Sequence, residues 1–292
     1  MGTLVNVDGK LGSEEDRLLS PLDQGFLFGA SVYETVRTYG GRTFLLARHL
    51  GRLRESAKAL DITLDVTDEE LSARIEETLV AAGNAESSIR IVVSAGVGSI
   101  DYRAGSAARP TVVVIVRPLP EYPDSLYREG VRAVVVPMMR AARGGIDPRI
   151  KSSNLLTNLS ALREAHRRKA YEAILLNPEG EVAEGSMSNV FLAAKGVVRT
   201  PPISAGILEG ITRELVIEVA REEGYPVEER GFKPEDLLRA DEVFITASAR
   251  QIVPIVQVDK TRIGNGKPGP VTRALIAAYK DKVRSLIQKE EG

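Results

Sequence analysis

The sequence predicts an α+β fold divided between two domains, and three observations lead to this prediction. Short runs of β-branched and apolar residues, typical of strands, occur in both halves of the 292-residue chain. Longer stretches with apolar residues at helical spacing lie among them. Three prolines fall within residues 117–125, between two strand-like runs, as is typical of a linker. We therefore predict a small N-terminal α/β domain at 1–117, a linker at 118–130 and a larger domain at 131–292.

The first domain should combine strands with two helices. Strands are expected at "LVNVDG", "SVYETVRTY", "TFLLA", "SIRIVVSAG" and "PTVVVIVRP". The first helix should begin at Arg48, because apolar residues at helical spacing follow it: Leu50, Leu53, Ala57 and Leu60. The second helix should begin at Thr67, because Thr67 and Glu70 have the spacing of a capping box ahead of further apolar residues.

The second domain should mix strands and helices in the same way. After a strand at 131–137 and the loop "RAARGGIDPRI", a helix is expected at about 155–169. Strands should follow at "YEAILL", "SNVFLAA" and "DEVFITAS". A helix over 211–224, which Gly224 would end, precedes the last of these strands, and a further helix forms the C-terminal segment.

The composition argues against several classes of function. Thirty-nine basic and forty acidic residues give a formal net charge of −1, without the basic excess of a nucleic-acid-binding protein. The chain has no cysteine and only two histidines, His49 and His166, which read as solvated or packing residues, so no metal site is expected. The first residues do not resemble a signal peptide, and the apolar runs are shorter than the roughly 18 residues of a membrane span. We expect a cytoplasmic protein without a nucleic-acid or membrane partner.

Lys151, in the stretch "DPRIKSSNLL", lies between a glycine-rich loop and an apolar run. Most lysines lie on solvated faces, and composition alone leaves that alternative open. A lysine at a point where the chain turns inward would instead be partly desolvated. Such an amine is a usable nucleophile for forming a Schiff base.

Three further stretches hold candidate binding groups. Glu184 is flanked by buried structure, where its carboxylate would either cap local amides or pair with a protonated ring nitrogen. In "AGILEGITREL", the free amides at a helix start, around Ile211 and Thr212, form a natural anion site. The strand in "FITASAR" ends in small residues that offer hydroxyls and amides: Thr246, Ala247 and Ser248.

Six motifs follow one another in the order "SVYETVR", "ARHLGRL", "KSSNLL", "YEAILLNPEGEVAEGSMSNVF", "GITREL" and "ITASAR". This order, over nearly the whole chain, resembles the class IV, or fold-type IV, pyridoxal-phosphate enzymes. That family includes branched-chain aminotransferases, D-amino-acid aminotransferases and aminodeoxychorismate lyases. The resemblance implies a two-domain enzyme with a small N-terminal α/β domain, a larger mixed α/β-barrel-like domain, and pyridoxal 5'-phosphate as cofactor.

The resemblance also implies roles for single residues. Lys151 matches the catalytic lysine, which holds the cofactor as a Schiff base and later moves a proton at the substrate. Glu184 matches the carboxylate that keeps the pyridine nitrogen protonated. Arg48 matches a phosphate-binding arginine, and the residues that match the rest of the phosphate site are Ile211, Thr212, Thr246 and Ala247.

The substrate pocket and the partner subunit are expected from the same resemblance. The residues that would line the pocket are Phe28, Tyr33, Arg37, Arg103, Ala247 and Ser248. Relatives are homodimers at least, and a loop of the neighbouring subunit, here within 94–105, would close each pocket. Arg103 is the candidate in that loop for reaching the partner's substrate.

The motifs leave the substrate open between relatives. "KSSNLL" and "EGSMSNVF" are similar to D-amino-acid aminotransferases, whereas the loop at 94–105 lacks the Arg-x-His pair typical of those enzymes. "TASA" resembles the turn that takes the substrate carboxylate in branched-chain enzymes. We expect ping-pong transfer of an amino group from an aliphatic, branched-chain-like L-amino acid to 2-oxoglutarate. A D-amino-acid aminotransferase, with (R)-amines as further substrates, and an aminodeoxychorismate lyase are the alternatives, and a non-catalytic relative is disfavoured by Lys151 and Glu184.

Overall fold

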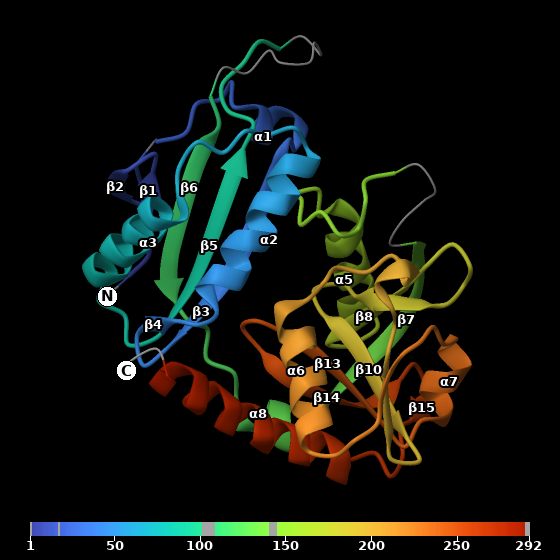
Figure 1. The fold of residues 1–292 in the computed structure, drawn as a ribbon. Helices are drawn as coiled ribbons and strands as arrows, with labels where there is room; N and C mark the ends of the chain where they lie inside the picture. The colour runs from blue at the N-terminus through green and yellow to red at the C-terminus, as the bar shows by residue number, and fades with distance from the viewer. Residues whose placement is uncertain (1, 17, 101–108, 140–144, 290–292) are drawn as a thin grey trace. The chain divides into compact units, whose positions relative to one another are not determined.

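The computed structural model describes residues 2–16, 18–100, 109–139 and 145–289. The chain packs as two compact units (Figure 1). The first comprises Met1–Pro120 together with Ile150–Asn154, and the second comprises Glu121–Arg149 and Leu155–Gly292. The short segment around Lys151 therefore belongs to the first unit, although residues of the second unit precede and follow it.

The first unit contains a six-stranded sheet in the order β2-β1-β6-β5-β3-β4, with every neighbouring pair antiparallel. Its strands are β1 (Leu4–Val7), β2 (Lys10–Ser13), β3 (Ser31–Tyr39), β4 (Arg42–Thr43), β5 (Ser87–Ser94) and β6 (Thr111–Pro118). Its helices are α1 (Gln24–Phe28), α2 (Leu46–Ala59) and α3 (Asp68–Ala82). Helix α2 packs on β3 and α3 packs on β6 and β1, so the two long helices cover one face of the sheet (Figure 1).

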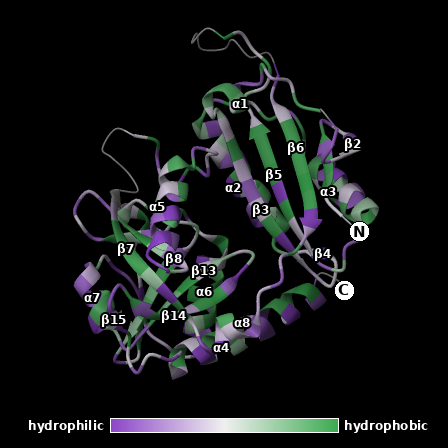
Figure 2. Cartoon of the chain, turned by 180° about the vertical axis from the view of Figure 1, so that it is seen from behind, coloured by the Kyte–Doolittle hydropathy of each residue, from purple (hydrophilic) through white to green (hydrophobic). Residues whose placement is uncertain are grey.

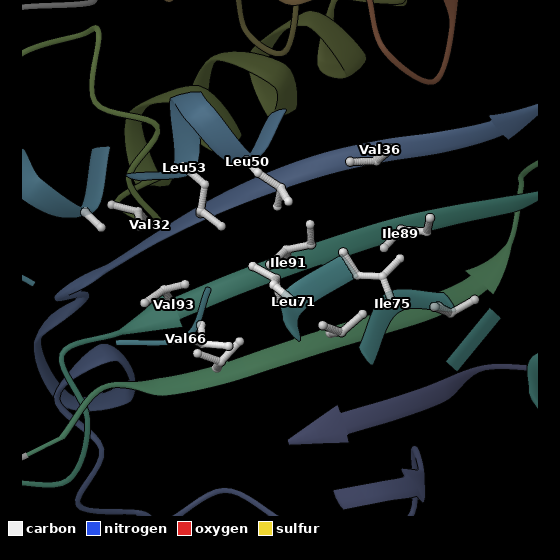
Figure 3. Close-up of a cluster of buried hydrophobic side chains, with 14 of the residues drawn as sticks. Val32, Val36, Leu50, Leu53, Val66, Leu71, Ile75, Ile89, Ile91 and Val93 are labelled. Atoms are coloured by element: carbon white, nitrogen blue, oxygen red, sulfur yellow. The ribbon is translucent and has the colours of Figure 1, made fainter. Parts of the chain in front are cut away.

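The core of the first unit lies between that face and the two helices. Figure 3 shows Leu50 and Leu53 of α2 among strand residues such as Val36. Side chains alternate along a strand, so β3 directs Val32, Glu34 and Val36 toward the helices. The odd positions of β3, which include Tyr33 and Arg37, lie on the opposite face. Each fully buried aliphatic side chain stabilises this core by roughly 2 kcal/mol.

The predicted start of α3 is confirmed, and one predicted strand is wrong. Thr67 Oγ1 accepts from the amide of Glu70 at 3.1 Å, and Glu70 Oε2 accepts from the amide of Thr67 at 2.9 Å, which completes the capping box. In "TFLLA" only Thr43 belongs to a strand. Leu45 has a left-handed φ of 53° that redirects the chain, and α2 begins at the next residue.

The second unit contains a mixed nine-stranded sheet that curls into a half-barrel. The order is β12-β11-β10-β13-β14-β7-β8-β9, and β15 pairs with β14. The strands are β7 (Val131–Met139), β8 (Glu172–Leu176), β9 (Val182–Gly185), β10 (Asn189–Ala194), β11 (Val197–Thr200), β12 (Val227–Glu229), β13 (Glu242–Ala247), β14 (Gln251–Val258) and β15 (Thr261–Arg262). The helices are α4 (Asp124–Arg128), α5 (Leu156–Arg167), the short η1 (Ile203–Ala205), α6 (Ile211–Glu222), α7 (Pro234–Arg239) and α8 (Pro270–Lys289).

The sequence predicted the long helices of the second unit but missed β14. The helices expected at 155–169 and 211–224 are confirmed as α5 and α6. Strand β14 contains Pro254, which has no amide hydrogen and normally argues against a central strand. Here Pro254 lies opposite Phe244 in a regular antiparallel register with β13. The expected α+β class, with a larger barrel-like second half, is confirmed.

The most hydrophobic segments of the first unit include central strands of its sheet. Figure 2 shows hydrophobic colour along much of β5 and β6, with polar residues interrupting it. Among the described residues, no helix is both long and apolar enough to cross a membrane.

Candidate active site

Residues 150–154 pair with the start of β3, whereas β4 pairs with its end. Ser152 forms an isolated antiparallel bridge with Val32. The amide of Tyr33 donates to the carbonyl of Lys151 at 2.9 Å, and the amide of Ser153 donates to the carbonyl of Ser31 at 2.9 Å. Strand β4 pairs only with Thr38 and Tyr39 of β3, so the edge of β3 at 31–33 is available for this pairing. The pairing fixes the backbone of Lys151 to the first unit.

The side chain of Lys151 lies beside Tyr33. Its Nζ is 4.6 Å from the centre of the Tyr33 ring, within the range of a cation–π contact. The guanidinium of Arg90, from β5, lies 3.8 Å from the centre of the same ring. Arg37, four residues along β3 on the same face, stacks on the ring of Tyr39 at 4.0 Å. A lysine and two arginines therefore gather on the sheet face that the helices leave uncovered.

A buried charged cluster lies on the other face, under α2. The carboxylate of Glu34 accepts from Arg52 through Nε at 2.6 Å and Nη2 at 2.8 Å, and contacts His49 Nδ1 at 2.7 Å. Burial opposes the charge of Glu34, but Arg52 and then His49 outweigh it and lower the pKa of Glu34 to about 2. Burial lowers the pKa of His49, although the hydrogen bond to Glu34 acts in the opposite direction. The neutral imidazole is therefore favoured.

Two expected residues of the first unit lie at exposed positions. Arg48 is exposed on α2, one turn before Arg52, whose side chain is mostly buried. Phe28 is the last residue of α1, and 38% of its surface is exposed. Tyr33 is buried. Arg103 lies outside the described residues.

In the second unit, Glu184 lies near the end of β9 and is 4% exposed. Its Oε2 accepts from the amide of Leu208 at 3.0 Å and from Asn189 Nδ2 at 3.4 Å. Asn189 Nδ2 also donates to the carbonyl of Leu208 at 3.0 Å. Asn189 therefore joins Glu184 to the segment that leads into α6.

The start of α6 has no side-chain cap. Its N-cap is Gly210, which offers no side-chain acceptor to the first amides, and Ile211 and Thr212 are the first helical residues. A Cβ on Gly210 would lie 1.9 Å from Asn189 Oδ1, so the close approach of these two residues requires glycine. Free amides and the positive end of the helix dipole favour a phosphate at this position.

Thr246 lies next to this region because it pairs with Asn189 across β10 and β13. Thr246 is 2% exposed, and its Oγ1 has no hydrogen-bond partner among the described residues. A buried hydroxyl without a partner is costly, so a ligand atom that bonds to it would be favoured. Ala247 ends β13, and Ser248 begins the turn that leads to β14.

The expected site residues thus form two groups, each within one unit. Lys151, Tyr33, Arg37, Phe28 and Arg48 belong to the first unit. The second unit holds the others that the structure describes: Glu184, Ile211, Thr212, Thr246, Ala247 and Ser248. Among the described residues, no group of three or more histidine, aspartate or glutamate side chains could hold a metal ion.

Residues 31–258 match the family model for amino-transferase class IV, and this range contains every site residue named above except Phe28. The chain belongs to the class IV aminotransferases. A relative at 38% identity is a Methanocaldococcus jannaschii protein provisionally named a branched-chain-amino-acid aminotransferase, over 95% of each chain. The D-alanine aminotransferase of Bacillus licheniformis is 33% identical over 98% of this chain and 99% of its own. The aminodeoxychorismate lyase of Bacillus subtilis (strain 168) is 34% identical over 99% of this chain and 98% of its own.

Solved structures of class IV aminotransferases share the whole fold. The branched-chain aminotransferase of the archaeon Thermoproteus uzoniensis, with norvaline, has a TM-score of 0.89 and 35% identity, and covers 97% of this chain and 95% of its own. The T.th. branched-chain aminotransferase with pyridoxamine 5'-phosphate has a TM-score of 0.92 and 30% identity, over 97% of this chain and 94% of its own. Class IV aminotransferases use pyridoxal phosphate, so the expected family, enzyme class and cofactor are confirmed.

Three charged residues of the first unit that lie near Lys151 or under α2 were not named as candidates from the sequence: Glu34, Arg52 and Arg90. Glu34 is the single acidic residue of a strand otherwise built for burial, at an inward position between Val32 and Val36. Arg52 is the second arginine of "RHLGRL", and the motif alone does not say which arginine is buried. Arg90 interrupts the apolar strand "SIRIVV" at an outward position. A polar residue that interrupts an apolar period would have marked Glu34 and Arg90.

Proposed function

We propose that this aminotransferase moves an amino group from an aliphatic, branched-chain-like L-amino acid to 2-oxoglutarate. The observation that supports this best is the match to the Thermoproteus uzoniensis enzyme, whose structure contains norvaline, an aliphatic amino acid. The relative at 38% identity has a branched-chain name as well. Amino acids and 2-oxo acids are the substrates of aminotransferases in general, so the proposal concerns which of them this chain uses.

The residues of the second unit fit a phosphorylated pyridine cofactor. The uncapped start of α6 suits the phosphate, with the amides of Ile211 and Thr212 as donors. The unpartnered hydroxyl of Thr246 and the amide of Ala247 would complete this phosphate site. Glu184, buried and held by Leu208 and Asn189, would pair with the protonated ring nitrogen.

For the first unit, we propose that Lys151 holds the cofactor covalently. Its backbone is fixed on both sides, because its amide donates to Ser56 Oγ at 3.1 Å and its carbonyl accepts from Tyr33. A fixed backbone restricts where the amine can reach, which is the condition for an oriented nucleophile. The ring of Tyr33 beside Nζ limits the water around that amine.

Bound pyridoxal phosphate supplies a conjugated ring that accepts the electron pair released at the substrate α-carbon. The chain's own residues do the rest. Once the substrate amine had replaced it, the freed Nζ of Lys151 would accept the proton from the substrate α-carbon and donate it to the cofactor carbon to which Nζ had been bonded. Glu184 keeps a proton on the ring nitrogen throughout. A ping-pong order would follow, because the cofactor would keep the amino group after the 2-oxo acid of the donor has left and before the acceptor binds.

The cofactor phosphate needs a cation, and the motif "RHLGRL" offers two. The residue that the motif predicts is Arg48, which is exposed on α2. Arg52 is the better candidate, because Glu34 fixes its guanidinium through two hydrogen bonds and its side chain is only 12% exposed. We therefore propose that Arg52 binds the phosphate, with Arg48 as the alternative.

The acceptor 2-oxoglutarate has a second carboxylate, which an arginine would bind. Arg90 is the candidate, because it is half-buried on the sheet face that also carries Lys151 and Tyr33. Burial lowers the pKa of Arg90, although the guanidinium remains charged near neutral pH, so a desolvated cation is available to an anion. Arg37, on the same face, is a second candidate.

Two other activities have support from relatives. D-alanine aminotransferases and an aminodeoxychorismate lyase match at 32 to 36% identity over nearly the whole chain. These enzymes would need the same lysine, glutamate and phosphate site, so the site described above does not separate them. The homodimer, the cytoplasmic location and the substrate roles of Phe28, Arg103 and Ser248 also stay predictions.

The decisive experiment is the visible absorption spectrum of the purified holoenzyme, recorded before and after adding L-leucine, D-alanine or aminodeoxychorismate in parallel samples. Conversion of the cofactor to its amine form by L-leucine, with recovery on adding 2-oxoglutarate, would support the proposal. Conversion by D-alanine alone would assign a D-amino-acid aminotransferase. Turnover of aminodeoxychorismate without the amine form would assign a lyase.

A further inference from the structure

A buried ion pair in the second unit joins two segments that lie next to candidate site residues. Glu172 begins β8 and is completely buried, and Arg250 ends the turn between β13 and β14 with 15% of its side chain exposed. Arg250 Nη2 is 3.3 Å from Glu172 Oε2. The two residues are 78 positions apart in the sequence, so the pair depends on the completed sheet.

Glu172 holds the loop that follows Glu184. Its Oε1 accepts from the hydroxyl and from the amide of Ser186, the latter at 3.1 Å, and its Oε2 accepts from the hydroxyl of Ser188 at 2.9 Å. The loop leaves no space for a side chain at Gly185, where a Cβ would lie 2.1 Å from Ser188 Oγ. Both serine hydroxyls are thereby directed to Glu172.

Arg250 bonds to the same loop. Its Nη2 donates to the carbonyl of Met187 at 3.1 Å, and its guanidinium lies 5.4 Å from the centre of the Tyr171 ring. Its own carbonyl accepts from the hydroxyl of Tyr127 at 3.3 Å. Arg250 therefore ties the turn after Thr246 and Ala247 to the loop after Glu184.

These contacts indicate more than a stabilising role. A buried ion pair gains little net stability over apolar residues of similar volume, because both charges lose their hydration. Such a pair does fix geometry, since each of its donors and acceptors must be satisfied at the same time. Here the satisfied groups belong to three consecutive residues of one loop, Ser186, Met187 and Ser188.

We propose that Glu172 and Arg250 are positioning residues that set the loop at 185–188 and the turn at 248–250 relative to each other. Glu184 and Asn189 flank the loop, and Thr246 and Ala247 precede the turn. The ion pair would thus keep a fixed distance and orientation between Glu184, which we assign to the cofactor ring, and Thr246 and Ala247, which we assign to the phosphate. It would also fix the turn that follows Ala247, where the substrate carboxylate would bind. This inference rests on the proposed function, because it assigns these segments to that site.

The test compares Arg250→Met, Arg250→Lys and the double variant Glu172→Gln/Arg250→Met with the wild-type holoenzyme. For Arg250→Met we expect the dissociation constant of pyridoxal phosphate and the KM of the amino donor each to rise at least about tenfold. We also expect the visible circular dichroism of the bound cofactor to change. Arg250→Lys, which keeps the charge but loses the planar donor group, should recover part of both constants.

Arg250→Met alone leaves the Glu172 carboxylate buried without its partner and could fail to fold for that reason. The double variant has no such carboxylate, so it keeps the test valid if the single variant does not fold. Arg199→Met is the matched control, since it removes an arginine from a partly exposed ion pair with Glu228 in the same unit and should leave both constants unchanged. Folded Arg250 variants with wild-type cofactor affinity, dichroism and KM would overturn the inference, even if their melting temperature falls. A wild-type enzyme that neither binds pyridoxal phosphate nor transaminates would instead overturn the proposed function.

Discussion

Arg52 bonds to both carboxylate oxygens of Glu34, with 2.6 Å from Nε to Oε1 and 2.8 Å from Nη2 to Oε2. Glu34 lies on β3 and Arg52 on α2, and His49 on the same helix contacts Oε2 as well. A fully buried carboxylate would be costly without these partners. The pair therefore fixes the rotation of α2 on the sheet and the direction of the Arg52 side chain.

Glu34→Gln should destabilise the protein at neutral pH by roughly 3 to 5 kcal/mol, because it leaves Arg52 without its buried partner. The pKa of Glu34 falls from its ordinary value of 4.5 to about 2 on folding. The ionised group hence stabilises the wild type fully above about pH 4.5, and this contribution disappears as the pH falls toward 2. Urea unfolding at pH 7 and at pH 3 should show a smaller difference between wild type and variant at the lower pH. Glu228→Gln, at an exposed ion pair, is the control and should cost at most about 1 kcal/mol.

Lys151→Ala should abolish transamination, with turnover reduced by about three orders of magnitude or more, because it removes the amine that we propose both holds the cofactor and moves the proton. The measurement is steady-state turnover together with the absorption of the bound cofactor. Lys260→Ala, at an exposed turn between β14 and β15, is the matched control and should behave as wild type. Turnover near the wild-type rate in Lys151→Ala would reject the role assigned to this lysine.

Glu184→Gln should lower the rate by about 100-fold or more while the cofactor stays bound, since the amide cannot hold a positive ring nitrogen. Its hydrogen bonds from Leu208 and Asn189 can persist in the variant, which makes the substitution conservative for structure. Cofactor content after dialysis and turnover are measured on the same sample. Loss of the cofactor would indicate that Glu184 serves binding and not the chemistry.

Gly210→Ala should weaken cofactor binding, because the new Cβ would lie 1.9 Å from Asn189 Oδ1 and push Asn189 away from Glu184. We expect a cofactor dissociation constant at least about tenfold higher and a stability loss of roughly 1 to 3 kcal/mol. Gly51→Ala is the contrasting substitution, in an exposed part of α2 with no atom within 4 Å of the added Cβ. It should raise stability by about 0.5 to 1 kcal/mol without changing cofactor binding.

Arg90→Met should raise the KM for 2-oxoglutarate by about tenfold or more and leave the KM for the aliphatic amino donor nearly unchanged. The reason is that only the acceptor has a second carboxylate. The two half-reactions, measured separately by stopped-flow absorption, give both constants. Equal effects on donor and acceptor would mean that Arg90 supports Tyr33 and does not select the acceptor.

The sequence predicted best those elements whose signals are local. Alternating residues over 31–39 predicted β3, and the spacing of Thr67 and Glu70 predicted the start of α3, because strand alternation and capping act within a few residues. Strand β14 was missed because Pro254 is unfavourable locally, and only its pairing with β13 and β7 makes the strand. The domain boundaries stay a prediction.

For the candidate site, motifs identified residue types but not their partners. Which arginine of "RHLGRL" is buried depends on the rotation of α2 against β3, and Glu34 sets that rotation from outside the motif. Similarly, Glu172 and Arg250 belong to different motifs, and only the sheet brings them together. Pairings between distant segments are decided by tertiary packing, which periodicity does not report.

The pairing of residues 150–154 with β3 has a consequence for biosynthesis. The first unit needs these five residues to satisfy Tyr33 and Ser31, yet the ribosome adds them about thirty residues after Pro120. A nascent chain that ends at Pro120 would expose this stretch of β3 as an open edge, which is prone to pair with other chains. The first half therefore completes its fold only after Asn154 has left the exit tunnel, when the start of the second half is already made.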